Sequence, residues 1–277
     1  MTTVSFRAFA AAAVTALALA ACGGSTTDDG SPTGGSEPTG AETSPSSADF
    51  ALVNDGTLTV CSEVPYAPFE MRNDDGTYSG FDMDLMAAIA DELGLEFEVV
   101  ESGFDAITSG SAMAAGDCDV AASAITITDE REENVDFSDG YFDADQSLLV
   151  PVGSDIASAD DLADKIVGVQ SGTTGEAYAK DNVTATDIRS FENGAELFVA
   201  LEAGDIDAVL QDLPVNVERA REDDQVEVVQ TFPTGETYGF AVQEEGKEDL
   251  LDAVNAALLA LRDNGTYDQI YDEYFGT

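Results

Sequence analysis

One basic residue stands inside an acidic stretch of the sequence, directly after a run of hydroxyl side chains. The stretch "SAITITDEREENVDFS" covers residues 123–138, and Arg131 is its single cation among five carboxylates. Arg131 either neutralises the neighbouring acids or binds the carboxylate of a ligand. A surface ion pair contributes only about 0–1 kcal/mol, whereas a charged hydrogen bond in a buried site contributes about 1.5–3 kcal/mol. The groups that the fold places beside Arg131 decide between the two interpretations.

A carboxylate of complementary chemistry follows a related segment in the second half of the chain. "AGDCDVAASA" (115–124) and "AGDIDAVLQD" (203–212) share the pattern A-G-D-x-D before an apolar run, although such a helix–turn–strand junction can also recur by coincidence. Ligands of open α/β sheets bind at the carboxyl ends of the strands. The residues delivered there are Ser123, Ala124, Thr126, Gln211 and Asp212. A cation with hydroxyls facing an aspartate is complementary to a zwitterion such as a free amino acid.

The composition excludes several kinds of site. The chain has 277 residues, enough for two lobes, with 56 Asp+Glu, 10 Lys+Arg and no His. Without His, a Ser-His-Asp or Cys-His enzyme and a His-ligated zinc site are excluded. The formal charge of −46 predicts no affinity for nucleic acid or for anionic membrane surfaces. The acidic "NDDG" (73–76) lacks the spacing of an EF-hand, so we expect neither a metal ion nor another cofactor.

The N-terminal segment has the pattern of an export signal. Residues 1–21 carry Arg7 and then an apolar stretch too short to span a membrane comfortably. Their last three residues and Cys22 form "LAAC" (19–22), which resembles a bacterial lipobox and predicts lipidation of Cys22; the alternative is an ordinary cleavage site. Residues 22–49 are rich in Gly, Ser, Thr and Pro, so a disordered tether is expected between the lipid and a folded part that begins near Phe50.

Two further cysteines permit a disulfide in an exported protein. Cys61 and Cys118 each lie in a short strand-like run. The sequence leaves two possibilities open, a bridge between them or two separate buried thiols.

Strand-like and helix-like segments alternate from residue 57 onward. Helices are expected at 80–94, near 104–115, at 194–205 and at 250–265. Strands are expected at 57–61, 96–100, 118–124, 165–170, 206–211 and 225–230. This alternation predicts an α/β protein built from βαβ units on mainly parallel sheets.

Eight segments in order give the chain a recognisable family pattern. They are "VPYAPFE", "GFDMDLMAAIADELG", "FDAI", "GDCDVAASAITITDER", "VDFSDGYF", "VGVQSGTT", "GDIDAVLQD" and "LRDNGTYDQIYDEYF". Together they resemble the bacterial extracellular solute-binding proteins of family 3, the polar amino-acid type that serves ABC importers. Gly140 stands where the family usually has proline.

The resemblance implies a two-lobed periplasmic-binding-protein-like fold of type II, whose lobes close by a hinge motion. The two crossover strands of the hinge are expected near 143–147 and 235–239. Lobe 1 would then comprise 50–143 plus 239–277, and lobe 2 would comprise 144–238.

The resemblance also implies roles for particular side chains. Arg131, Thr126, Thr173 and Thr174 would bind the α-carboxylate of an amino acid, and Asp212 would bind its α-ammonium together with a carbonyl near Ser123 or Ala124. Tyr66 and Phe104 would enclose the side chain, which Glu63 would contact. The complete predicted set is Glu63, Tyr66, Phe104, Ser123, Ala124, Thr126, Arg131, Gln170, Gly172, Thr173, Thr174 and Asp212.

The predicted function is capture of a free amino acid and its delivery to the membrane permease of an ABC importer. Glu63 and the acidic surface favour a cationic or neutral polar ligand over an acidic one. The protein would be a monomer without catalytic activity, held at the outer face of the cell membrane by the lipid on Cys22. The alternatives are an extracytoplasmic dehydratase-like enzyme on the same fold, or an amino-acid sensor.

Overall fold

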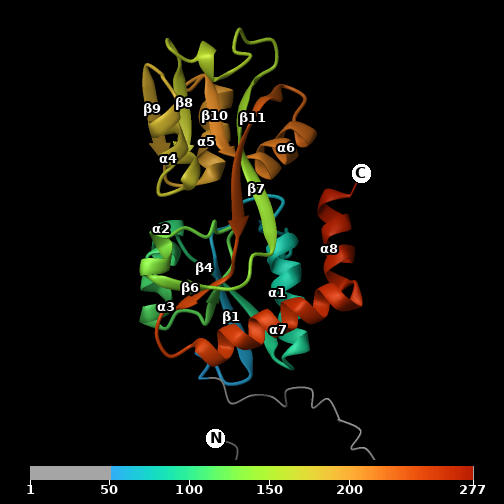
Figure 1. Ribbon diagram of the computed structural model, residues 1–277. Coiled ribbons are helices and arrows are strands. Elements are labelled where there is room, and N and C mark those ends of the chain that lie inside the picture. Colours follow the sequence, from blue (N-terminus) through green and yellow to red (C-terminus); the bar gives the residue numbers. More distant parts are fainter. Residues whose placement is uncertain (1–50, 277) are drawn as a thin grey trace, which may run out of the picture. The chain divides into compact units, whose positions relative to one another are not determined.

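The computed structural model describes residues 51–276 and contains two separate five-stranded sheets (Figure 1). The predicted signal peptide, the lipidation site Cys22 and the tether lie outside the described residues. No helix within 51–276 is long and apolar enough to cross a membrane.

The first sheet has the strand order β4-β1-β5-β12-β6. Its strands are β1 (Thr57–Ser62), β4 (Glu96–Glu101), β5 (Val120–Ala121), β6 (Val135–Phe137) and β12 (Ala241–Gln243). The helices of this lobe are α1 (Phe81–Glu92), α2 (Phe104–Thr108), α3 (Ser111–Ala115), α7 (Glu248–Asn264) and α8 (Thr266–Phe275). A small hairpin of β2 (Met71–Arg72) and β3 (Tyr78–Ser79) precedes α1, and the single-turn helix η1 (Arg131–Glu133) precedes β6.

The second sheet has the strand order β11-β7-β10-β8-β9. Its strands are β7 (Phe142–Pro151), β8 (Ile166–Gln170), β9 (Asp187–Phe191), β10 (Ala208–Asp212) and β11 (Val226–Tyr238). The helices here are α4 (Thr174–Asn182), α5 (Gly194–Ala203) and α6 (Leu213–Glu222), with a short turn η2 (Ala159–Asp161). Together the two sheets form the two lobes of a type II binding-protein fold.

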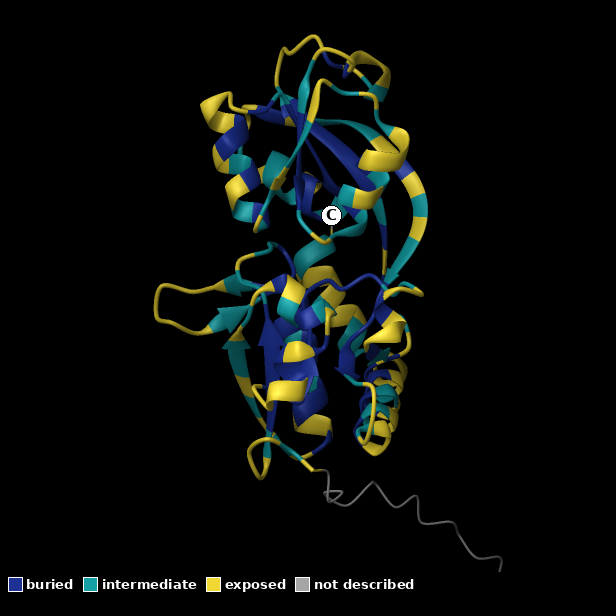
Figure 2. Cartoon of the chain, turned by 90° about the vertical axis from the view of Figure 1, so that its left-hand side faces the viewer, coloured by how far each residue is buried: buried dark blue, intermediate teal, exposed yellow. Residues whose placement is uncertain are grey.

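The inner strands of both sheets are buried (Figure 2). Successive side chains of a strand point to opposite faces of its sheet, so both faces are buried there. In β1, Leu58 and Val60 belong to the core that includes α1 and α7, whereas Cys61 faces the core that includes α2 and α3. In β10, Leu210 packs with α4 and Val209 packs with α5. Helices therefore cover both faces of each sheet, and only the sheet edges and strand ends remain free for ligands.

Two long strands carry the chain between the lobes. β7 and β11 pair antiparallel from Pro151↔Val226 to Phe142↔Tyr238. Beyond Tyr238 the chain continues through Gly239 and Phe240 directly into β12 of the first sheet (Figure 1). The boundaries expected at 143/144 and 238/239 fall within or at the end of these strands.

The A-G-D-x-D pattern marks the same junction in both lobes. Gly116 and Gly204 end α3 and α5 in the left-handed conformation. Three residues later, the Asp119 carboxylate accepts the backbone N–H of Thr59, and the Asp207 carboxylate accepts that of Ile166. The second aspartate of the pattern therefore ties its own strand to the beginning of the neighbouring parallel strand.

Three expectations from the sequence were wrong in detail. The helix expected near 104–115 is two short helices, because the chain breaks at Gly110 with φ 71°. The strand expected at 118–124 is only Val120–Ala121, because the backbone turns at Ala124 with φ 45°. The sheets are also more mixed than predicted, since β6, β7, β11 and β12 all pair antiparallel.

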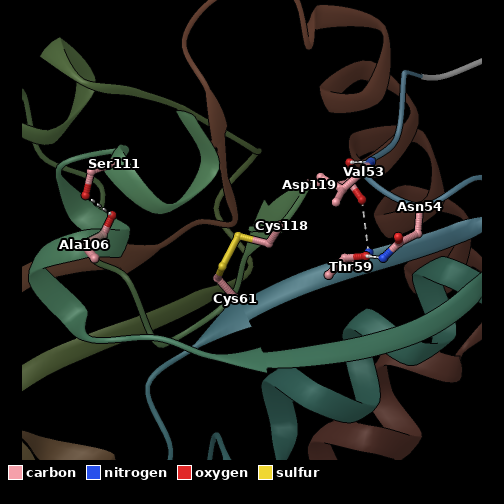
Figure 3. The surroundings of a disulfide bond; sticks show 8 residues. All are labelled: Val53, Asn54, Thr59, Cys61, Ala106, Ser111, Cys118 and Asp119. Carbon is pink, nitrogen blue, oxygen red and sulfur yellow. Dashed lines mark hydrogen bonds between the residues drawn. A yellow bond between two sulfur atoms is a disulfide. The ribbon is translucent and has the colours of Figure 1, made fainter. Parts of the chain in front are cut away.

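A disulfide joins Cys61 in β1 to Cys118 immediately before β5, with their Cα atoms 5.6 Å apart (Figure 3). The bridge lies beside the Asp119 carboxylate that holds the N–H groups of Val53 and Thr59. A covalent bond and a buried carboxylate thus fix the same two strands.

Replacing both Cys61 and Cys118 by Ser should lower the free energy of unfolding by about 4 kcal/mol, because the bridge closes a loop across a sequence separation of 57. Denaturant titration would measure the loss, with Cys22→Ser in every sample to prevent new pairing. Reduction of the unsubstituted protein should produce the same loss. A change below about 1 kcal/mol would contradict the structural role.

Gly80→Ala should be more destabilising than Gly76→Ala. Both glycines have positive φ, 123° and 86°, but a Cβ at Gly80 would lie 2.2 Å from the Phe69 carbonyl oxygen, while nothing lies within 4 Å of one at Gly76. We expect a loss of about 3 kcal/mol at Gly80 and about 1 kcal/mol at Gly76. Equal losses in thermal or chemical unfolding would contradict the close approach.

Candidate ligand-binding site

The Arg131 side chain is buried, although acids flank it in sequence. It is 8% exposed and forms no ion pair with any carboxylate of residues 51–276. Its Nη1 donates to the Thr126 carbonyl at 2.7 Å and its Nη2 to the Gly172 carbonyl at 3.1 Å. The guanidinium also lies over the Phe104 ring, 5.1 Å from its centroid. Local neutralisation of the acidic stretch therefore does not explain Arg131.

Burial has a measurable electrostatic consequence for this cation. Loss of hydration lowers the pKa of Arg131, and the carboxylates of Asp212, Glu236 and, more weakly, the neighbouring Glu130 offset part of the effect. A buried charge is costly unless an opposite charge is bound to it. Arg131 is thus suited to an anionic ligand group.

Asp212 lies at the last position of β10, where α6 begins. Its Oδ2 accepts the hydroxyls of Tyr66 at 3.0 Å and of Tyr238, and its Oδ1 accepts the Gln146 amide at 2.5 Å. Burial raises the pKa of Asp212, while these hydrogen bonds and the charge of Arg131 lower it in part. The carboxylate is therefore held rigidly by neutral donors.

Glu63 follows the end of β1 and bridges the two lobes. Its Oε1 accepts the Gln170 amide at 2.8 Å, and its Oε2 accepts the backbone N–H of Phe104 at 2.9 Å. Burial raises the pKa of Glu63; the two hydrogen bonds lower it in part, and the Asp105 carboxylate raises it further. Glu63 thus contributes a partly buried carboxyl group, held by both lobes, to the region around Phe104 and Gln170.

Away from the crossover strands, three side-chain hydrogen bonds join residues of the first lobe to residues of the second. They are Tyr66 to Asp212, Gln170 to Glu63, and Arg131 to the Gly172 carbonyl. Each uses a side chain that the sequence assigned to the ligand. The same groups that hold the lobes together are therefore those that a ligand would engage.

The beginning of α4 supplies backbone N–H groups to this region. Thr173 is the N-cap of α4; its Oγ1 accepts the N–H of Glu176 at 3.1 Å and donates to the Gln170 carbonyl at 2.8 Å. The helix N-terminus carries a partial positive charge that favours anions. Thr174, the first residue of the helix, donates its hydroxyl to Glu236 at 3.3 Å.

A cavity lies between the lobes and brings the predicted residues together. Its lining consists of Glu63, Tyr66, Phe104, Ser123, Ala124, Thr126, Arg131, Gln170, Thr173, Thr174 and Asp212. Gly172, the remaining predicted residue, does not line it but accepts the hydrogen bond from Arg131. The volume of this cavity is only about 20 Å³. In this closed arrangement the side chains pack almost against one another.

Three residues around Asp212 were not predicted from the sequence: Gln146, Glu236 and Tyr238. All three lie on the strands that cross between the lobes. The Gln146 amide lies 2.8 Å from Glu236 as well as 2.5 Å from Asp212, and Tyr238 donates to Asp212 from the end of β11. Gln146 lies in the expected crossover 143–147, and Glu236 and Tyr238 lie in the expected crossover 235–239. Their polar side chains at the hinge could therefore have indicated that they belong to the site.

A larger depression of about 800 Å³ lies elsewhere, against β7, α6 and α8. Its lining includes Phe142 and Phe275, and its one basic residue, Arg221, is paired with Glu218 at 2.8 Å. It therefore lacks the buried, unpaired cation that distinguishes the cavity between the lobes.

Comparison with known proteins agrees with this geometry. Residues 58–277 match the family described as bacterial extracellular solute-binding proteins, family 3. A probable histidine-binding protein from Neisseria gonorrhoeae is 36% identical over 275 residues, which cover 96% of this chain and 94% of that protein.

Two solved structures are similar in sequence and fold. An ancestral arginine-binding protein bound to glutamine has a TM-score of 0.75 and 40% identity, covering 81% of this chain and all of that one. The ancestral amino acid-binding protein AncCDT-1, a precursor of cyclohexadienyl dehydratase, has a TM-score of 0.74 and 40% identity, covering 79% of this chain and 96% of that one. The protein therefore belongs to the bacterial extracellular solute-binding proteins of family 3.

Proposed function

We propose that the protein captures a free amino acid outside the cytoplasm and delivers it to the permease of an ABC importer. The observation that carries the proposal is the pairing of Arg131 and Asp212 on one cavity. Among residues 51–276, the buried Arg131 guanidinium forms no ion pair with a carboxylate and the buried Asp212 carboxylate forms none with a cation. The two groups therefore match the two ends of an α-amino acid.

The α-carboxylate would take the place of the carbonyl groups that Arg131 now contacts. A planar guanidinium binds a carboxylate through two parallel hydrogen bonds, and the N-terminus of α4 adds N–H donors. The α-ammonium would bind Asp212. For a ligand of about ten heavy atoms these contacts make a Kd between about 1 μM and about 10 nM attainable.

The side chain of the ligand would lie between Tyr66 and Phe104 and extend toward Glu63. Glu63 is ionisable and half-buried, and Gln170 beside it can donate or accept a hydrogen bond. An acidic side chain would meet a like charge there. We therefore favour a cationic or neutral polar amino acid.

Capture requires the lobes to separate, because the closed cavity has too little room for an amino acid. The crossings at β7 and β11 would act as the hinge, with lobes at 50–143 plus 239–277 and at 144–238. We further propose that lipidated Cys22 anchors a monomer to the outer face of the membrane. Such an anchor would hold the protein near its permease.

A second candidate is an enzyme on the same scaffold, favoured by the similarity to the precursor of cyclohexadienyl dehydratase. Glu63 would then be the acid of the site. Binding is preferred because the buried Asp212 carboxylate can accept a hydrogen bond from an ammonium group. An enzyme that eliminates water from a ligand without an ammonium group would not need this carboxylate. A sensor would bind the same amino acid and differ only in its partner.

A thermal-shift screen of the twenty amino acids should identify at least one stabilising ligand. A ligand at a concentration 100-fold above its Kd adds about 2.7 kcal/mol to the stability of the folded state. Arg131→Ala should abolish the shift, while Arg189→Ala, which removes an exposed arginine paired with Asp187, should not. Absence of a shift with every amino acid would reject amino-acid binding and revive the enzyme.

The affinity for L-arginine should depend on pH more strongly than the affinity for L-glutamine. The raised pKa of Glu63 means that its carboxyl group becomes neutral at a higher pH than an ordinary glutamate. Binding of a cationic side chain needs the ionised form, so L-arginine affinity is highest above this pKa and falls as the pH drops through it. Calorimetric titration across the pH range would measure the ratio of the two affinities.

Glu63→Gln should remove the pH dependence of that ratio and weaken L-arginine binding at least about tenfold more than L-glutamine binding. An unchanged ratio in the variant would show that Glu63 does not contact the side chain.

A further inference from the structure

Two carboxyl groups that the proposed site does not use lie directly behind it. Glu70, before β2, and Asp82, in the first turn of α1, are both 0% exposed. Each holds one of two consecutive residues of the cavity wall. The Ser123 hydroxyl donates to Glu70 Oε1 at 2.9 Å, and the Ala124 N–H donates to Asp82 Oδ2 at 2.8 Å. The two acids therefore converge on a single peptide unit.

That peptide unit has an unusual backbone conformation. Ala124 is the one non-glycine residue with positive φ in the part of the chain that the structure describes, at 45°. An alanine in this region is strained, so other contacts must hold it there. Because a trans peptide directs its N–H and C=O to opposite sides, the bond from Ala124 N–H to Asp82 turns the Ser123 carbonyl away from Asp82. Ser123 and Ala124 both line the cavity.

Each acid also has one oxygen without a partner among residues 51–276. These atoms are Glu70 Oε2 and Asp82 Oδ1. The other donor to Asp82 is the Tyr141 hydroxyl, which reaches Oδ2 at 2.7 Å. Complete burial makes an oxygen without a hydrogen bond costly, and a proton between the two acids would satisfy both.

The charges around the pair favour such a proton. The groups that act most strongly on Glu70, besides burial, are the carboxylates of Asp82, Glu63 and Asp212 and the Ser123 hydroxyl, and none of these is a cation. Burial and Asp82 raise the pKa of Glu70 well above its usual range, and burial raises the pKa of Asp82 to about 7. Two adjacent buried carboxylates cannot both ionise at low cost.

The phenols that pack around the pair are neutral. Burial is the largest cause that raises the pKa of Tyr66, Tyr141 and Tyr238, and neighbouring carboxylates raise it further. They can donate hydrogen bonds but supply no positive charge to balance a second anion.

We propose that Glu70 and Asp82 share one proton, carried by Glu70 and donated to an ionised Asp82, and that this pair aims the Ser123 carbonyl into the cavity. Both are then positioning residues for the ammonium group of an amino acid. The last step rests on the proposed function; the shared proton and the hold on Ala124 do not.

Replacing each acid by its amide tests the shared proton, because an amide group donates N–H bonds whether or not a proton is shared. In Glu70→Gln, the amide oxygen can accept from Ser123 and the amide N–H₂ can donate to Asp82, so the amide replaces the proton. In Asp82→Asn, the amide oxygen can accept from Ala124 and the N–H₂ can donate to an ionised Glu70. With both substitutions, the N–H donors outnumber the acceptors and two N–H₂ groups oppose each other, so we expect the contact between residue 82 and the Ala124 N–H to weaken.

Three measurements on the full chain would decide the proposal. Infrared spectroscopy at pH 7 should show a band of a buried protonated carboxyl group, which both single variants lose. Amide exchange of Ala124, followed by NMR, should remain slow in each single variant and become at least about tenfold faster in Glu70→Gln/Asp82→Asn. Titration with L-arginine, L-histidine and L-glutamine should give losses of affinity below about threefold for each single variant and above about tenfold for the double variant.

Each measurement tests a different part of the proposal. A missing carboxyl band in the unsubstituted protein would overturn the shared proton. Ala124 exchange in the double variant as slow as in the unsubstituted protein would overturn the positioning role, as would affinity losses in the single variants equal to that of the double variant. If the unsubstituted protein binds none of the three amino acids, the proposed function is rejected, and the band and the exchange rate still decide the pair.

Discussion

The burial of Arg131 is the constraint on which the arrangement of the site depends. In the described part of the chain, this guanidinium donates to two carbonyl oxygens, lies over the face of Phe104 and forms no ion pair, so it is held in a low-dielectric position. Such a charge is unfavourable for folding by itself, so the stability must come from the rest of the molecule. The two cores of each lobe, the disulfide and the paired crossover strands provide a rigid frame that can hold it in place.

The crossover strands link this charge to the opposite one. Gln146 on β7 and Tyr238 on β11 both donate to Asp212, which itself ends β10. The binding groups are therefore built into the strands whose bending would move the lobes. Loss of the contact from Tyr66 or the contact to Gly172 would accompany opening, and a ligand that supplies both a carboxylate and an ammonium would compensate for both.

The sequence predicted which residues line the cavity better than it predicted the local structure. Periodicity located α1, α5 and α7 because their apolar residues repeat along one face, and the family pattern named every residue that lines the cavity. The break at Gly110 and the turn at Ala124 were missed, because both depend on contacts with segments distant in sequence. Glu70 and Asp82 were missed for the same reason, since an acid in an amphipathic segment gives no sign that it is fully buried.

The number of hydrogen bonds that Asp212 already accepts limits how it can bind a ligand. A carboxylate offers about four lone-pair sites, and the hydroxyls of Tyr66 and Tyr238 and the amide of Gln146 occupy three. One site is left for an incoming group. A primary ammonium carries three hydrogens, so the remaining two must find acceptors elsewhere on the cavity wall. Recognition of such a group is thereby divided among several atoms, and a ligand nitrogen with fewer hydrogens would leave an acceptor unsatisfied.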